Sequence, residues 1–263
     1  MDYGFYRELL VEKSDRTLRL TINRPDALNV VTGRLHVELS RIFTDISLDE
    51  DVDVVVLTGA GKAFCAGGDI GWMRDMLDVP GGFAAISGEG KRIVNSLLDL
   101  DKPVVCRLNG DAVGLGATLA LFCDVIIADE VANIADPHVR VGLVAGDGGA
   151  VIWPQLIGYP RAKELLLTGD AVNARDAATM GLINRAVPAD QLDAEVDRIV
   201  QKLLRQPQSA MRWTKASVNI GLKMLTDATL EASIGYEIAS AALPDHREAV
   251  TAFLEKRRPN FKR

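Results

Sequence analysis

A strand-like run, Pro103–Leu108, leads into the glycine-rich stretch Asn109-Gly110-Asp111-Ala112-Val113-Gly114-Leu115-Gly116-Ala117-Thr118, and an apolar, helix-like run, Leu119–Cys123, leads out of it. Glycines let the backbone turn sharply and approach a ligand closely, because no side chain obstructs it. The first N–H groups of the following helix have no intrahelical partner, which suits them to hold an oxyanion or a phosphate. The stretch therefore predicts either such a binding turn or a tight strand-to-helix joint without chemistry.

The composition is that of an ordinary globular protein, with 25% charged and 48% hydrophobic residues. The 263 residues are enough for one domain with an appendage or for two small domains. A net charge of −6 argues against nucleic acid as a partner. No apolar run reaches the roughly 18 residues that a membrane span needs, so we expect no membrane partner.

The few cysteines and histidines also limit the kinds of metal site that the chain can form. Cys65, Cys106 and Cys123 lack metal-type spacing, so we expect reduced thiols. The N-terminal residues do not resemble a signal peptide, and we expect a cytoplasmic protein. Only three histidines occur, which leaves no conventional zinc site to expect.

Periodicity predicts an α/β protein in which strand, glycine loop and helix recur around a largely parallel sheet. The expected strands are 9–12, 17–22, 52–58, 103–108, 124–128, 132–135 and 182–187. The expected helices are 32–48, one within 80–101, and three in a helical tail at about 190–205, 208–225 and 227–258.

A second glycine-rich loop, Gly59–Asp69, directly follows the apolar strand 52–58. Its glycine spacing fits neither the Walker phosphate loop nor the dinucleotide fingerprint. The chain therefore contains two glycine-rich turns that directly follow strands, Gly59–Asp69 and Asn109–Thr118.

Together these motifs resemble the enoyl-CoA hydratase/isomerase (crotonase) family over essentially the whole chain. The matching segments are Asn23-Arg24-Pro25 with Asn29, Phe64–Asp69, Asn109–Gly116, Cys123-Asp124 and Phe253–Pro259. The resemblance implies the crotonase fold, with a core of stacked ββα units over residues 1–200 that carries both oxyanion loops. It also implies that the helical region 201–263 closes the CoA site and forms the interface of a homotrimer or a dimer of trimers.

The resemblance further implies an acyl-CoA substrate, with coenzyme A as part of that substrate and no other cofactor. The thioester carbonyl oxygen would lie between the backbone N–H groups of Gly68 and Leu115, and such a donor is worth about 3–4 kcal/mol in a transition state. The loop Ala66–Asp69 would bind CoA, with the backbone around Ala66 holding the adenine. Arg24 and Lys256 are candidates for the CoA phosphates, or else solvated surface charges. An acyl pocket, or simply a core face, is expected from Trp72, Met73, Met76, Phe83 and Ile86.

The acid–base positions depart from the family pattern. Where hydratases of the family carry two glutamates, this chain has Thr118 and His138. Histidine titrates near neutrality, and Asp147, nine residues on, has the right chemistry to orient the imidazole and stabilise its cation. The structural alternatives are a core histidine and an aspartate that caps the next helix.

The segment around His138 and Asp147 resembles one branch of the superfamily, the oxocamphor hydrolases, which cleave carbon–carbon bonds in β-diketones. By that resemblance His138, held by Asp147, deprotonates a water that attacks a carbonyl, and an ungapped count places the branch's glutamate at Glu237. The branch's second histidine has no counterpart, since its position falls near Leu115. Three functions stay open beside a hydratase or isomerase: this hydrolysis, a thioesterase or dehalogenase with Asp147 as nucleophile, and a non-catalytic acyl-CoA-binding protein.

Overall fold

The computed structural model describes residues 1–261 and has a six-stranded main sheet in the order β1-β2-β3-β4-β6-β9. In this sheet β1 and β2 pair antiparallel, whereas β2–β3, β3–β4, β4–β6 and β6–β9 pair parallel. The strands are β1 Leu9–Ser14, β2 Thr17–Ile22, β3 Val54–Gly59, β4 Val104–Leu108, β6 Val125–Asp129 and β9 Arg185–Val187. The predicted α/β class with a largely parallel sheet is confirmed.

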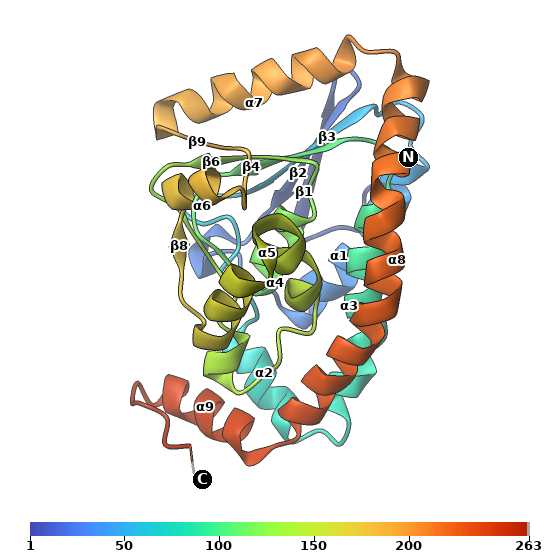
Figure 1. Cartoon of the computed structure of the whole chain (residues 1–263). Helices are drawn as coiled ribbons and strands as arrows, with labels where there is room; N and C mark the ends of the chain where they lie inside the picture. Colours follow the sequence, from blue (N-terminus) through green and yellow to red (C-terminus); the bar gives the residue numbers. More distant parts are fainter. Residues whose placement is uncertain (262–263) are drawn as a thin grey trace.

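Helices cover both faces of the sheet, which explains why β3 is a continuous apolar run. Val54 and Val56 pack against Val196 of the helix α7, Ala189–Leu204. The alternate residues of β3 point the other way, into the main core beneath α1 (Gly33–Ser47) and α3 (Gly82–Asp99). A strand buried on both faces needs apolar residues at every position. Figure 1 shows α7 lying across one end of the molecule, next to the sheet.

A small second sheet, in the order β5-β7-β8, completes the stacked units. Each unit pairs a strand of the main sheet with a short strand or turn and then a helix, as in β4–β5–α4 and β6–β7–α5. The remaining elements are β5 Ala112–Val113, β7 Asn133–Ala135, β8 Val172–Asn173, α2 Ile70–Leu77, α4 Leu115–Leu121, α5 Gly149–Thr168, α6 Ala174–Met180 and the 3-10 helices Pro25–Ala27 and His138–Val141. The glycine-rich stretch therefore does open a helix, α4.

The helical tail differs from its prediction. The expected break between 225 and 227 is wrong, because α8 runs unbroken over Gln208–Ala241. Thr226 lies inside it, buried, and its hydroxyl donates to the carbonyl of Leu222 over 2.8 Å. The break comes instead where Pro244 begins α9, Pro244–Leu254, as proline favours the first helical turn.

The tail packs on the core rather than standing apart from it. In Figure 1, α8 runs along one side of the molecule, from the end near α7 to the end where α9 lies against α2. Along this course α8 contacts both α3 and α5. The proposed division at residue 200 stays a prediction.

All three cysteines, Cys65, Cys106 and Cys123, are buried and unpaired. None of the helices in the described part of the chain is long and apolar enough to cross a membrane.

Candidate active site

A cavity of about 80 Å³ lies where the two glycine loops meet α1, α3 and α8. Its lining contains all five residues that the sequence proposed as catalytic: Gly68, Leu115, His138, Asp147 and Glu237. The apolar part of the lining includes every residue expected for an acyl pocket, together with two isoleucines of α8: Trp72, Met73, Met76, Phe83, Ile86, Ile234 and Ile238. Residues far apart in the sequence thus form one mostly apolar pocket with a few polar groups, as is typical of ligand sites.

The two loops hold Gly68 and Leu115 in place through their neighbours. Asp69 donates its N–H to Val31, over 3.0 Å, and Gly114 donates to Ala135, over 2.9 Å. Gly114 has φ +54°, a conformation that favours glycine, and Leu115 is the first residue of α4. Within residues 1–261 neither the N–H of Gly68 nor that of Leu115 has a hydrogen-bond partner. Both donors are therefore available to a ligand in the cavity.

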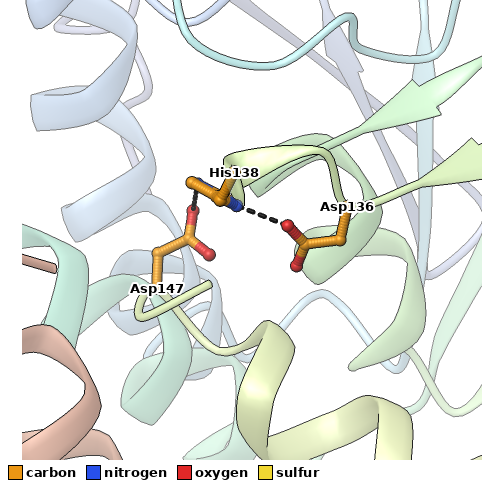
Figure 2. A group of neighbouring side chains, drawn as sticks. All are labelled: Asp136, His138 and Asp147. Carbon is orange, nitrogen blue, oxygen red and sulfur yellow. Dashed lines mark hydrogen bonds and ion pairs between the residues drawn. The ribbon is translucent and has the colours of Figure 1, made fainter. Parts of the chain in front are cut away.

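His138 lies between two aspartates (Figure 2). Its Nδ1 forms a short hydrogen bond with Oδ1 of Asp136, and its Nε2 lies 3.5 Å from Oδ2 of Asp147. Asp147 also accepts a hydrogen bond from the hydroxyl of Thr118, over 3.3 Å. The carboxylate that fixes the imidazole at Nδ1 is thus Asp136, whereas the sequence assigned that task to Asp147.

Charge and burial act in opposite directions on this cluster. Burial alone lowers the pKa of His138, but the charges of Asp136 and then Asp147 outweigh it, and the pKa is held well above its usual value. Burial raises the pKa of Asp147, and the positive charge of His138 only partly offsets that rise. The imidazole therefore holds its proton at neutral pH, in a group where two carboxylates share one cation.

Glu237 projects from α8 into the same cavity. Its side chain packs over Gly146, where an added Cβ would lie only 2.7 Å from Oε2 of Glu237. Within the described residues its carboxyl group has no hydrogen-bond or ion-pair partner. Burial, and then the charge of Asp147, raise the pKa of Glu237 to about 8, so it is a neutral acid at pH 7.

The residues predicted to bind CoA do not lie in this cavity, and their role stays a prediction. The guanidinium of Arg24 is already held by Glu8, 3.2 Å away, and by the carbonyl of Val30, 2.7 Å away. Asp69 caps α2 by accepting the N–H of Trp72 over 2.9 Å. Ala66 donates its N–H to Leu28 over 3.1 Å, while Lys256 is exposed just beyond α9. Within residues 1–261 the ammonium group of Lys256 makes neither an ion pair nor a hydrogen bond, so it stays available to a phosphate.

Asp136, His138 and Asp147 also have the ligand types of a cation site, since one donor atom from each lies within 4.8 Å of the others. In this arrangement both imidazole nitrogens face a carboxylate. A cation would have to displace one of these contacts, so the observed geometry fits a protonated imidazole held by two carboxylates better than metal ligation.

Comparison with known proteins identifies the family. The model of the enoyl-CoA hydratase/isomerase family matches residues 12–263. A crotonyl-CoA hydratase from Syntrophomonas wolfei is 34% identical over 258 residues, which cover 97% of this chain and 98% of that protein. The chain therefore belongs to the enoyl-CoA hydratase/isomerase family, and the family expected from the motifs is confirmed.

Solved structures agree on the fold. The crystal structure of an enoyl-CoA hydratase/isomerase from Mycobacterium paratuberculosis has a TM-score of 0.91 at 38% identity, and the match covers 95% of this chain and 99% of that one. A β-diketone hydrolase from the cyanobacterium Anabaena has a TM-score of 0.84 at 29% identity, over 92% of this chain and 98% of that one. The crotonase fold is thus confirmed, and one structural neighbour carries the activity of the β-diketone branch.

Sequence reasoning missed two residues of the site. Asp136 stands two positions before His138, and the short spacing Asp-Pro-His was the signal that could have found it. His36, on the apolar face of α1, also lines the cavity and forms a 2.8 Å contact with Glu89 of α3. The sequence pattern of α1 gives no sign that His36 faces a cavity, because the positions around it on this face of the helix belong to the core.

Proposed function

We propose that this protein acts on an acyl-CoA thioester, whose carbonyl oxygen binds between the N–H groups of Gly68 and Leu115. The observation that carries the proposal is that these two N–H donors, which have no partner within the described residues, lie in one cavity with His138, Asp147 and Glu237. A pair of preorganised donors stabilises the negative charge of an enolate better than water does. Membership of the hydratase/isomerase family supports the same substrate class.

In this proposal His138, Asp147 and Glu237 replace the two family glutamates. Addition of water to a conjugated thioester requires a proton donor for the α-carbon and a proton acceptor for the water. Glu237 is a neutral carboxylic acid with no hydrogen-bond partner among residues 1–261, which suits it to be the donor. The His138 imidazolium adds positive charge beside the forming enolate.

The test is a steady-state assay with crotonyl-CoA, run on the wild-type protein and on His138→Ala. We expect hydration at an ordinary enzymatic rate and a loss of about 10²- to 10⁴-fold in the variant. If the protein binds CoA by calorimetry but turns over no crotonyl-CoA, the hydratase assignment is wrong.

The backbone donor can be tested separately by comparing Leu115→Pro with Leu115→Ala. Proline is tolerated at the first position of a helix and removes the N–H together with the leucine side chain, whereas alanine removes the side chain but keeps the N–H. We expect Leu115→Pro to lose about 10²- to 10³-fold in kcat, or roughly 3–4 kcal/mol, and Leu115→Ala to lose far less. Equal losses in the two variants would remove Leu115 from the oxyanion site.

A second candidate is hydrolysis of a β-diketone, because an Asp–His pair faces a mostly apolar cavity and one structural neighbour is a β-diketone hydrolase. Cleavage of 1,3-cyclohexanedione without CoA would favour this candidate. The trimeric or hexameric assembly and the cytoplasmic location stay predictions.

A further inference from the structure

The cavity contains a second histidine, and its surroundings differ from those of His138. His36 is buried on α1, and its Nδ1 lies 2.8 Å from Oε2 of Glu89 on α3. The aromatic ring of Trp72 lies beside it, with 5.6 Å between the ring centres. One nitrogen of His36 is therefore fixed by a carboxylate, and the ring is held in position by packing.

The other nitrogen of His36 is open. Within residues 1–261, Nε2 of His36 has no hydrogen-bond partner. Unlike a fully buried atom, it keeps some exposed surface. His36 is one of the residues that line the cavity, and the exposed part of its ring includes this nitrogen. The third histidine differs in this respect, because Nε2 of His246 is enclosed by protein and its Nδ1 bonds to the carbonyl of Val141.

The contact with Glu89 also selects the form of the imidazole. A carboxylate at Nδ1 accepts a hydrogen bond, so the proton of the neutral ring lies on Nδ1 and the lone pair lies on Nε2. His138, by contrast, has a carboxylate facing each nitrogen and no lone pair directed to the cavity. Of these two cavity histidines, only His36 presents a proton acceptor.

We propose that His36, held by Glu89, is the general base of this cavity and takes a proton from the attacking water. The inference rests on the proposed function and names the acceptor that the proposed function requires. In hydration, one O–H bond of water breaks and its proton moves to Nε2 of His36, while the water oxygen bonds to the β-carbon. The π electrons move toward the thioester oxygen between Gly68 and Leu115, and the α-carbon then takes the proton of Glu237. Exchange with solvent returns the proton from His36 to Glu237.

The charged groups around His36 agree with a base that is neutral at pH 7. Burial lowers its pKa, and the charge of Glu89 only partly opposes this. Asp147, facing it from the loop before α5, raises the pKa further, and Arg92 of α3 lowers it. The ascending limb of the pH–rate profile is therefore expected below the usual range of histidine.

The kinetic test compares His36→Gln with the wild type in the crotonyl-CoA assay. We expect kcat to fall about 10²- to 10⁴-fold, with the ascending limb of the pH profile lost. Glu89→Gln is expected to shift that limb, since Glu89 acts only through His36. Lys91→Gln, on the same helix but outside the cavity, is the matched control and keeps the wild-type rate. A His36→Gln variant that keeps the wild-type kcat and pH profile overturns the proposal.

A second measurement uses the wild-type protein and does not depend on turnover. In a spectrum of ¹⁵N-labelled histidine at pH 7, we expect His36 to be protonated on Nδ1 and bare on Nε2, and the Nε2 resonance to move when acetoacetyl-CoA or 1,3-cyclohexanedione is added. A proton on Nε2, or no movement with either compound, overturns the proposal. If the wild type turns over neither crotonyl-CoA nor the diketone, the proposed function fails, and the spectrum alone decides whether His36 faces the ligand.

Discussion

His36 and His138 line the same cavity but face opposite surroundings. One carboxylate contacts His36, and burial outweighs it, so the pKa of His36 falls. Two aspartates flank His138, and their charges outweigh its burial, so the pKa of His138 rises. The comparison teaches that the number of nearby carboxylates, more than burial, decides which histidine is a proton acceptor and which is a cation.

The largest expected effect comes from removing the aspartate that distinguishes the two histidines. Asp136→Asn keeps the shape of a side chain that packs tightly over Gly149, but it removes the strongest attraction on the His138 cation. We expect the pKa of His138 to drop and kcat to fall by about 10³- to 10⁴-fold, as when a histidine loses its orienting carboxylate. Kinetics and a histidine NMR titration measure the two effects.

Asp170→Asn serves as the control for that substitution, because Asp170 is exposed and forms its ion pair with Arg140 on the surface. The control is expected to match the wild type. If the pKa of His138 stays high in Asp136→Asn, then Asp147 alone sustains the cation, and the contrast between the two histidines has another origin.

A smaller effect is expected from Glu237→Gln, which removes the acid but keeps its size. We expect kcat to fall by about 10²- to 10³-fold. An acid works only while protonated, so wild-type activity should decline as the pH rises through about 8, the pKa to which burial raises Glu237. This alkaline decline should be absent from whatever activity the variant retains. Glu231→Gln, exposed on the same helix, is the control, and an unchanged alkaline limb in Glu237→Gln would assign that limb to another group.

Much of the fold was predictable because its determinants are local. The apolar run of β3 and the paired glycine loops each specify an element from a few neighbouring residues. The tail was harder, because threonine is not favoured inside helices, yet in the structure the hydroxyl of Thr226 bonds to the preceding turn and α8 continues through it. α5 was missed as a long helix since Pro154, Gly158 and Pro160 interrupt its pattern, and the backbone is indeed kinked at Gly158.

The site was predictable only where a motif or a family position carried the signal. Gly68, Leu115 and His138 stand at such positions, and the cavity unites them. Glu89 and His36 meet only because α1 packs against α3, which no local pattern encodes. A contact across 53 residues depends on tertiary packing, so it could be found only in the structure.

The smallest effect is a difference in the pH dependence of stability. The pKa of His36 is lower in the folded protein than in the unfolded chain, where it is 6.5, so below that pH the unfolded chain binds more protons and the free energy of unfolding falls as the pH falls. The pKa of His138 is higher in the folded protein, so above pH 6.5 the folded state holds the extra proton and the free energy of unfolding falls as the pH rises toward the folded pKa.

His36→Gln should therefore flatten the acid side of the stability curve, and His138→Gln should reduce the decline on the alkaline side. Urea unfolding at about pH 5, 6.5 and 8.5 measures the free energy of unfolding on each side, which changes in total by about 1.4 kcal/mol for each unit of pKa shift. If both variants alter the same side, the two histidines do not titrate in opposite directions.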